Sequence, residues 1–186
     1  MNIEQSHIVV AVCGGISAYK VPSILSALKH NGFWVTVMQT PNSEHFVTHE
    51  SLQVMANGYW QQNWGRPIHI EITGFLSYND AFLVVPATAN TIAKIANGFG
   101  DNLVTDTALA LNNNVKKIIC PAMNSRMLFN KTVQRNIQQL MDDGWNIIKP
   151  VYGALACGTT GDGKLPPTRK IVDLVVEIMG KDRRCQ

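Results

Sequence analysis

The stretch Ile8-Val9-Val10-Ala11-Val12-Cys13-Gly14-Gly15-Ile16-Ser17 decides the fold. Its first six residues are an unbroken apolar run rich in β-branched side chains, which is typical of a strand buried on both faces. The two glycines end that strand. Apolar residues at positions 21, 24, 25 and 28 then recur at the spacing of one helix face, and Asn31-Gly32 ends the helix. Pro22 fits this helix only in its first turn or at a kink.

The same alternation of strand and helix recurs along the chain. Further strands are predicted at 33–38, at 81–85 (ending at Pro86), at 115–120 and at 145–148. Helices are predicted, weakly, over 43–55 and then over 92–96, 101–111, 133–141 and 171–178, with loops over 57–66 and 153–167. Strands that alternate with helices predict a parallel sheet covered on both faces. We therefore expect a single α/β domain over residues 1–186, built as a doubly wound, Rossmann-like or flavodoxin-like sheet.

Composition excludes several classes of protein. Of the 186 residues, 46% are hydrophobic and only 16% are charged. The charged share lies below the ~25% of average soluble domains, which indicates extensive burial, including burial between subunits. The net charge of +3 is mild and no basic cluster alternates with aromatic residues, so we expect no nucleic-acid partner. No apolar run reaches the ~18 residues that span a bilayer, so we expect no membrane segment.

The four cysteines stand at positions 13, 120, 157 and 185. They are far apart, with no Cys-x-x-Cys pair and no neighbouring histidine, so we expect neither a metal site nor a disulfide framework. This usage predicts a reduced, cytoplasmic protein. Cys13 and Cys120 lie in strand-like runs and are predicted to pack in the core. Cys157 differs, because glycines surround it in a predicted loop, and its reactivity would depend on its local pKa.

Ligands of open parallel sheets bind beyond the carboxyl ends of the strands, so we expect functional residues in the segments 14–17, 40–43, 86–91 and 121–127. Segment 14–17 suits an anion, because glycine lets backbone N–H groups approach it and a helix begins there; a plain tight turn is the alternative. The side chains of segment 86–91 are small enough for a flat ring to lie against the backbone. The alternative is that this segment caps a helix. Asn124, or Arg126 more strongly, would hold a carboxylate, with helix capping again the alternative.

His69 lies between Ile68 and Ile70 in a stretch that looks like a strand. A lone histidine there is more often structural than catalytic. Taken together and in this order, however, the motifs resemble the flavin-dependent cysteine decarboxylase family over residues 8–178. The matching pieces are Gly14-Gly15-Ile16-Ser17-Ala18-Tyr19-Lys20, His69, Pro86-Ala87-Thr88-Ala89-Asn90-Thr91, Ala96-Asn97-Gly98 with Asp101-Asn102-Leu103, Pro121-Ala122-Met123-Asn124 with Met127, and Leu155-Ala156-Cys157-Gly158.

The resemblance implies a flavoprotein in which FMN oxidises the cysteine moiety of the substrate, after which the carboxylate leaves as CO₂ and an enethiol forms. One branch acts on 4′-phosphopantothenoylcysteine in coenzyme A biosynthesis and then reduces the enethiol, giving 4′-phosphopantetheine. The alternative branch acts on a C-terminal peptide cysteine in lantibiotic maturation and releases the enethiol. The acid of the reduction step corresponds to Cys157, whose presence favours the first branch.

The resemblance also implies roles for single residues. His69 would be the essential base, and histidine as a residue type exchanges protons near neutral pH. FMN would be held by Gly14, Gly15, Ile16, Ser17, Thr40, Ser43, Thr88, Ala89, Asn90 and Thr91. Substrate would be held by Asn124, Met127, Ala154, Leu155, Ala156 and Lys164. Lys164-Leu165 replaces the usual Arg-Met pair, which keeps a positive charge but loses a bidentate contact. The resemblance further implies that this chain forms a homo-oligomer, a trimer or a dodecamer, with FMN near the subunit contacts.

Overall fold

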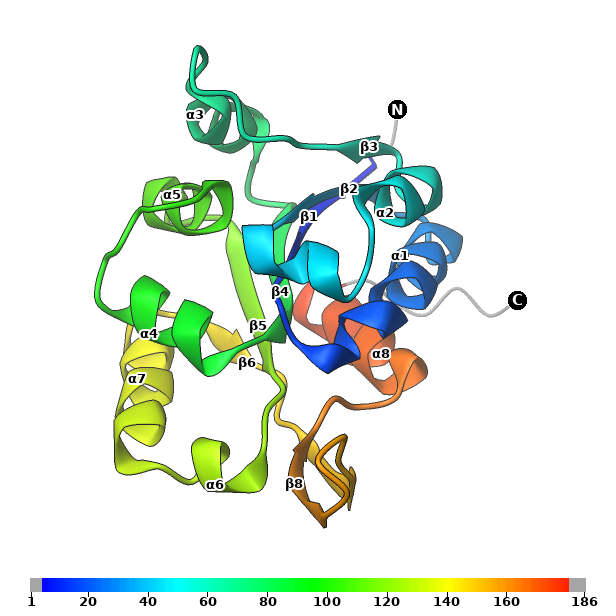
Figure 1. Ribbon diagram of the computed structural model, residues 1–186. Helices are drawn as coiled ribbons and strands as arrows, with labels where there is room; N and C mark the ends of the chain where they lie inside the picture. Colours follow the sequence, from blue (N-terminus) through cyan, green and yellow to red (C-terminus); the bar gives the residue numbers. More distant parts are fainter. Residues whose placement is uncertain (1–4, 181–186) are drawn as a thin grey trace.

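The computed structural model describes residues 5–180. Its centre is a six-stranded sheet in the order β3-β2-β1-β4-β5-β6, in which each neighbouring pair is parallel (Figure 1). The strands are β1 (His7–Val12), β2 (Trp34–Gln39), β3 (Gly58–Tyr59), β4 (Ala81–Ala87), β5 (Lys116–Pro121) and β6 (Asn146–Ile147). This order confirms the predicted doubly wound parallel sheet.

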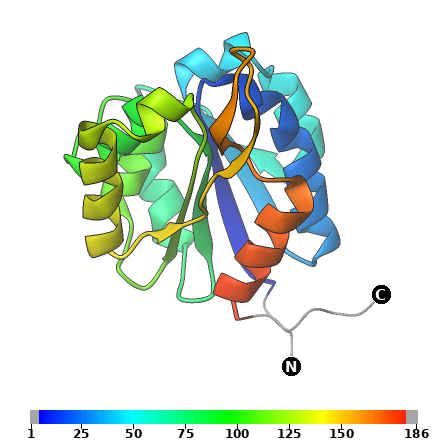
Figure 2. The same cartoon turned by 90° about the horizontal axis from the view of Figure 1, so that it is seen from below.

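Helices cover both faces of the sheet (Figure 2). One face carries α1 (Val21–His30), α2 (His49–Met55) and α8 (Thr168–Ile178), and the other carries α3 (Ile68–Phe75), α4 (Ala89–Ala96), α5 (Leu103–Ala110) and α7 (Lys131–Asp142). Three short helical turns, η1 (Ile16–Lys20), η2 (Pro41–His45) and α6 (Ser125–Leu128), follow strand ends. Pro22 lies in the first turn of α1, one of the two positions that the sequence allowed, where a helix does not need its N–H as a donor.

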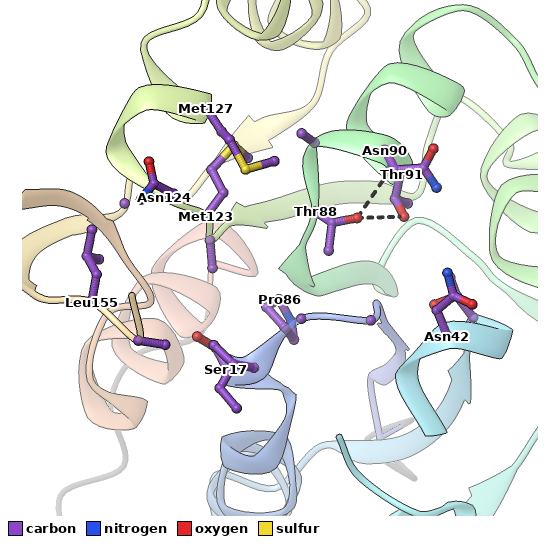
Figure 3. Close-up of a pocket in the computed structure, with 18 of the residues that line it drawn as sticks. Ser17, Asn42, Pro86, Thr88, Asn90, Thr91, Met123, Asn124, Met127 and Leu155 are labelled. Carbon is purple, nitrogen blue, oxygen red and sulfur yellow. Dashed lines mark hydrogen bonds between the residues drawn. The ribbon is translucent and has the colours of Figure 1, made fainter. Parts of the chain in front are cut away.

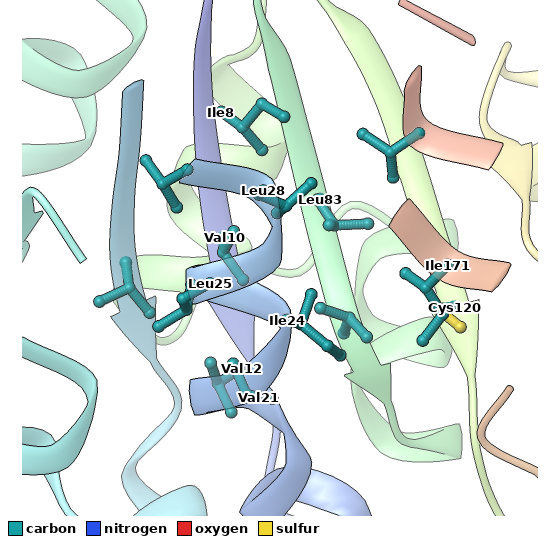
Figure 4. Packing of buried hydrophobic residues seen from close by; sticks show 14 of the residues in the cluster. Ile8, Val10, Val12, Val21, Ile24, Leu25, Leu28, Leu83, Cys120 and Ile171 are labelled. Atoms are coloured by element: carbon teal, nitrogen blue, oxygen red, sulfur yellow. The ribbon is translucent and has the colours of Figure 1, made fainter. Parts of the chain in front are cut away.

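The apolar run at residues 8–13 forms a central strand that lies between two hydrophobic cores, one on each face of the sheet. Ile8, Val10 and Val12 face α1 and α8, as Figure 4 shows, and the alternate residues face the other layer. All six residues from 8 to 13 are fully buried, because parallel strands expose neither face. Cys13 and Cys120 lie in these cores, as predicted. Burial raises the pKa of Cys13 to about 11 and that of Cys120 to about 12. Cys185 lies outside the described residues.

The prediction that His69 lies in a strand is wrong, because this residue belongs to α3. The error comes from isoleucines at 68, 70 and 72, whose alternation imitates a strand. Ile68 and Ile72 are buried on one helix face at i, i+4 spacing, whereas Ile70 is 53% exposed. The weak helix predicted over 43–55 is divided between η2 and α2, and the loop over 57–66 contains the short strand β3.

The prediction that 153–167 is a loop is also wrong. This segment contains most of an antiparallel hairpin of β7 (Val151–Ala154) and β8 (Thr160–Lys164). Strands rich in glycine and alanine are not recognised from β-propensity, because β-propensity is high for β-branched and aromatic residues. Pro86 also lies inside β4 rather than ending it. In Figure 1 the hairpin projects from the end of the sheet, beside α6.

Candidate active site at the carboxyl end of the sheet

A cavity of about 860 Å³ opens beyond the carboxyl ends of β1, β2, β4 and β5. Its size is within the ~300–1,000 Å³ of small-molecule sites. Because β1 lies between β2 and β4, the chain turns away to opposite sides at this point, which is where doubly wound sheets bind ligands. Figure 3 shows the four post-strand segments and the hairpin converging on this space.

The Gly14-Gly15 turn brings three of these segments together. A Cβ on Gly14 would lie 2.8 Å from the backbone of Asn42, which follows β2. A Cβ on Gly15 would lie 3.5 Å from the methyl group of Thr88, which follows β4. The next residues open a helical stretch that runs from η1 directly into α1. The first N–H groups of a helix have no partner within it, so this end of the cavity suits an anion.

Thr88 has two roles in this geometry. Its Oγ1 accepts a hydrogen bond from the N–H of Thr91 at 3.4 Å and so caps α4. The Thr91 hydroxyl lies 3.3 Å from the same oxygen (Figure 3). Thr88 therefore both caps α4 and lines the cavity. Ala89 and Asn90 line the same side of the cavity. Small side chains with polar edges at this wall suit a flat, hydrogen-bonding ring.

The charges that line the cavity are mostly positive. Lys20, Lys94 and Lys164 line it together with one carboxylate, that of Asp101. Lys94 donates a hydrogen bond to Asp101, which lowers the pKa of that carboxyl group. With this pair neutralised, the remaining lining charge is positive and favours anionic ligands.

The hairpin is fastened to the segment that follows β5. The N–H of Met123 donates to the carbonyl oxygen of Gly163 at 3.0 Å, and the Ser125 hydroxyl donates to that of Asp162. A Cβ on Gly163 would collide with the Met123 carbonyl oxygen, and one on Gly161 with the Ser125 hydroxyl. Glycine at these two positions of β8 therefore allows the strand to lie close to the segment after β5.

That fastening places Cys157, at the hairpin tip, against Asn124. Nδ2 of Asn124 donates to Sγ of Cys157 at 3.1 Å, while its Oδ1 accepts from the N–H of Arg126 at 2.8 Å and caps α6. The Thr159 hydroxyl lies 3.1 Å from the same sulfur. Hydrogen bonds from the Thr159 side chain, then from its backbone and from Asn124, lower the pKa of the Cys157 thiol from its ordinary value. This exposed thiol thus differs from the two buried ones.

The structure brings together every predicted site residue except Ser43 and His69. Ser43 is fully buried beneath the cavity wall, where its hydroxyl donates to the Thr40 carbonyl oxygen at 2.6 Å. His69 lies on α3, which Figure 1 places at the far end of the molecule from the hairpin. Arg126, the stronger carboxylate ligand considered above, does not line the cavity.

Several lining residues had no role assigned from the sequence. They are Tyr19, Lys20, Pro41, Asn42, Pro86, Lys94, Asp101, Asn102, Ala122, Met123 and Gly163. Most follow a strand or flank a predicted site residue, so the position rule could have found them. Asp101 belongs to one of the matching motifs, but nothing in the sequence predicted its pairing with Lys94, which forms between α4 and the loop before α5.

Within residues 5–180 no helix has the length and apolar character needed to cross a bilayer. The same residues contain no group of three or more His, Cys, Asp or Glu side chains arranged to hold a metal ion.

Comparison with known proteins agrees with this geometry. A family model described as Flavoprotein matches residues 1–180. A probable phosphopantothenoylcysteine decarboxylase of Streptococcus mutans is 37% identical over 91% of this chain and 97% of its own length. The coenzyme A biosynthesis bifunctional protein CoaBC of Bacillus subtilis is 35% identical over 92% of this chain, which spans 43% of that longer protein.

Solved structures give the same result. A PPC decarboxylase variant complexed with pantothenoylaminoethenethiol has a TM-score of 0.85 and 26% identity, covering 96% of this chain and 100% of the other. The FMN binding protein AtHal3 has a TM-score of 0.78 and 27% identity over 92% and 95%. The epidermin biosynthesis protein EpiD of Staphylococcus aureus has a TM-score of 0.79 and 27% identity over 91% and 99%. This chain therefore belongs to the Flavoprotein family, among the flavin-dependent cysteine decarboxylases, and is a relative of phosphopantothenoylcysteine decarboxylase.

Proposed function

We propose that this protein decarboxylates 4′-phosphopantothenoylcysteine to 4′-phosphopantetheine, with FMN as cofactor, in coenzyme A biosynthesis. The observation that carries the proposal is the hydrogen bond between Asn124 and Cys157, which both line the cavity of about 860 Å³. An amide that holds a carboxylate and a thiol that supplies a proton are two of the groups this reaction requires from the protein, and the base assigned to His69 is the third. The similarity to a probable phosphopantothenoylcysteine decarboxylase along nearly its whole length supports this substrate.

The residues of the cavity fit FMN. The Gly14-Gly15 turn and the start of η1 would offer backbone N–H groups to the phosphate, and Ser43 would hold Thr40 beside it through its hydrogen bond to the Thr40 carbonyl oxygen. The wall from Thr88 to Thr91 offers hydroxyl and amide groups to the ring. When bound there, the flavin supplies the two-electron oxidation of the cysteine moiety and later returns both electrons.

The substrate would lie between the flavin site and the hairpin. Asn124 has one Nδ2 hydrogen directed to Cys157, which leaves the other for the substrate carboxylate, since its Oδ1 is already used by the helix cap. Met127 and the residues from Ala154 to Ala156 would cover the apolar part of the substrate. Lys164 would attract its phosphate.

Cys157 would act as the acid in the reduction step. Its sulfur accepts a hydrogen bond from the Asn124 amide, so a substrate whose carboxylate is held by that amide would bring the carbon that loses CO₂ close to the thiol. We expect Cys157→Ser to release CO₂ but to stop at the enethiol, as mass spectrometry of the products would show. Full conversion to 4′-phosphopantetheine by this variant would contradict the role.

His69 would come from a second copy of the chain. It lies outside the cavity of its own chain, on a helix that exposes Ile70, and Trp64 in the preceding loop is 90% exposed. Exposed apolar groups of this kind suit a subunit contact. We therefore propose a homo-oligomer, a trimer or a dodecamer, in which α3 of one copy completes the cavity of its neighbour.

Subunit mixing tests this arrangement. His69→Asn should retain flavin but release no CO₂, and Asn124→Asp should do the same because its added charge repels the substrate carboxylate. If sites are shared, a mixture of the two inactive variants regains part of the activity after subunit exchange. A mixture that stays inactive, while tagged subunits demonstrably exchange, would show that His69 does not act across an interface.

The substrate itself is tested by incubation of the flavin-loaded protein with 4′-phosphopantothenoylcysteine. Release of CO₂ with formation of 4′-phosphopantetheine supports the proposal. No turnover, together with decarboxylation of a peptide that ends in cysteine, would favour the lantibiotic-type alternative. The similarity to EpiD supports testing that alternative. A cytoplasmic location and the absence of nucleic-acid and membrane partners remain predictions from the sequence.

A further inference from the structure

The tip of the β7–β8 hairpin fixes the position of Cys157 relative to Thr159. The N–H of Gly158 donates to the Leu155 carbonyl oxygen at 3.0 Å, and the N–H of Leu155 donates to the Thr159 carbonyl oxygen at 2.8 Å. Gly158 has a φ of +81°. These contacts describe a three-residue hairpin loop that ends in a left-handed glycine. Such a loop leaves the side chains of Cys157 and Thr159 side by side, with Sγ 3.1 Å from Oγ1.

We propose that Thr159 is a positioning residue, whose hydroxyl holds the Cys157 sulfur toward the cavity and makes its thiol a better proton donor. The inference rests on the function proposed above. Nothing in that function assigns a role to Thr159, and the residue does not line the cavity. It would act only through Cys157.

The hydroxyl is not needed for the hairpin to form. Hairpin pairing uses the carbonyl oxygen of Thr159, and the base of the hairpin is held by Met123 and Ser125. Thr159 is exposed, so its side chain adds little to the core. Among residues 5–180 the Thr159 hydroxyl makes one hydrogen bond, which is with the reactive sulfur. An exposed hydroxyl with that single partner points to a role in the chemistry of the thiol.

The proton balance shows where the hydroxyl would help. In the reduction step a bound flavin would supply two electrons, as hydride, to one carbon of the enethiol, and Cys157 would give a proton to the other. The thiol thereby becomes a thiolate, which the Thr159 hydroxyl and the Asn124 amide stabilise by donating hydrogen bonds. Solvent then returns the proton to Cys157. The lowered pKa of this thiol has the Thr159 side chain as its first cause, in agreement with this role.

Four proteins test the inference: the wild type, Thr159→Val, Thr159→Ser and Thr160→Val. Valine matches the shape of threonine without the hydroxyl, and serine restores the hydroxyl. Thr160 is the matched control, because it is the next exposed threonine of the hairpin and makes no hydrogen bond to Cys157 among the described residues. The first measurement is the rate at which iodoacetamide alkylates Cys157 in the flavin-loaded protein, followed by mass spectrometry across pH 6–10 (roughly the range over which thiols ionise).

The expected result is a profile displaced to higher pH in Thr159→Val, with alkylation several-fold slower at pH 7. Thr159→Ser and Thr160→Val should follow the wild type. An unchanged profile in Thr159→Val, or an equal displacement in Thr160→Val, would overturn the inference. This readout does not depend on turnover.

The second measurement is the ratio of released enethiol to 4′-phosphopantetheine. Thr159→Val should release several-fold more enethiol at an unchanged initial rate of CO₂ release, because only the later proton transfer is affected. An unchanged ratio would overturn the inference and leave the proposed function standing. A wild type that releases no CO₂ would overturn the proposed function and this inference with it, even if the alkylation profiles differ.

Discussion

The Gly14-Gly15 turn and the β7–β8 hairpin are both rich in glycine and both border the cavity, yet they differ in what the glycines allow. In the turn, glycine lets two loops that follow parallel strands approach a third. In the hairpin, Gly161 and Gly163 press a strand against the segment after β5, while Gly158 turns the exposed tip. Glycine content therefore says little about flexibility until the neighbours of each Cα are known.

The hairpin base should be the most sensitive position. Gly163→Ala adds a Cβ that collides with the Met123 carbonyl oxygen, at a φ of +118°. We expect it to lower the free energy of unfolding by about 3 kcal/mol, as urea titration would measure, and to separate Cys157 from Asn124. Gly144→Ala is the control, because that φ is +84° with nothing within 4 Å; its loss should be about 1 kcal/mol. Equal losses would mean that close approach is unimportant here.

The turn after β1 should come next. Gly14→Ala places a Cβ 2.8 Å from the Asn42 backbone, which we expect to lower the free energy of unfolding by about 2 kcal/mol. Flavin affinity should fall roughly tenfold as the turn shifts, a loss equal to ~1.4 kcal/mol, and fluorescence titration would measure it. Gly15→Ala makes only an ordinary contact, 3.5 Å from Thr88. It should therefore destabilise the fold less than Gly14→Ala, and the reverse order would refute this account of the turn.

The hairpin tip should tolerate substitution better than its base. Gly158→Ala introduces a Cβ at a φ of +81° with no neighbour within 4 Å, so we expect a loss of about 1 kcal/mol from backbone strain alone. The displaced tip should nevertheless change the proportion of enethiol released. A loss in stability as large as that of Gly163→Ala would contradict the claim that the tip tolerates substitution better than the base.

The smallest effect is expected at Asp101, across the cavity. Hydrogen bonding from Lys94 lowers its folded pKa, so the pair stabilises the fold at neutral pH and stops doing so as pH falls through the folded pKa. Since Asp101 is exposed and Lys94 is partly exposed, Asp101→Asn should lower the free energy of unfolding by only about 0.5 kcal/mol or less at pH 7. The variant and the wild type should converge in acid. A difference that persists after Asp101 is protonated would not come from its charge.

The fold was largely predictable because burial leaves a local signal. Six consecutive apolar residues before Gly14 predict a central parallel strand regardless of the remaining chain. His69 was misplaced because a short run of alternating isoleucines satisfies both the strand period and the i, i+4 spacing of α3. The β8 strand was missed because its glycines are required by close contacts with Met123 and Ser125, which are distant in sequence.

The candidate site was predictable to the extent that it follows strand ends. The segments after β1, β2, β4 and β5 all reach the cavity, as the rule for open sheets predicts. The resemblance supplied the hairpin residues and His69. Thr159 had no signal in either, because its contact with Cys157 depends on the turn at Gly158. Contacts made by a loop tip follow from backbone geometry that composition does not record.

Val151 pairs with Lys164, so the two ends of the hairpin meet at one point beside the sheet. A segment whose ends meet can be replaced without moving what flanks it, as loops of many folds are. The segments proposed to hold the flavin and the hairpin proposed to set the product thus lie on separate pieces of chain. We therefore expect hairpins exchanged between Val151 and Lys164, with Gly161 and Gly163 kept for the contacts with Ser125 and Met123, to change the ratio of saturated to unsaturated thiol product.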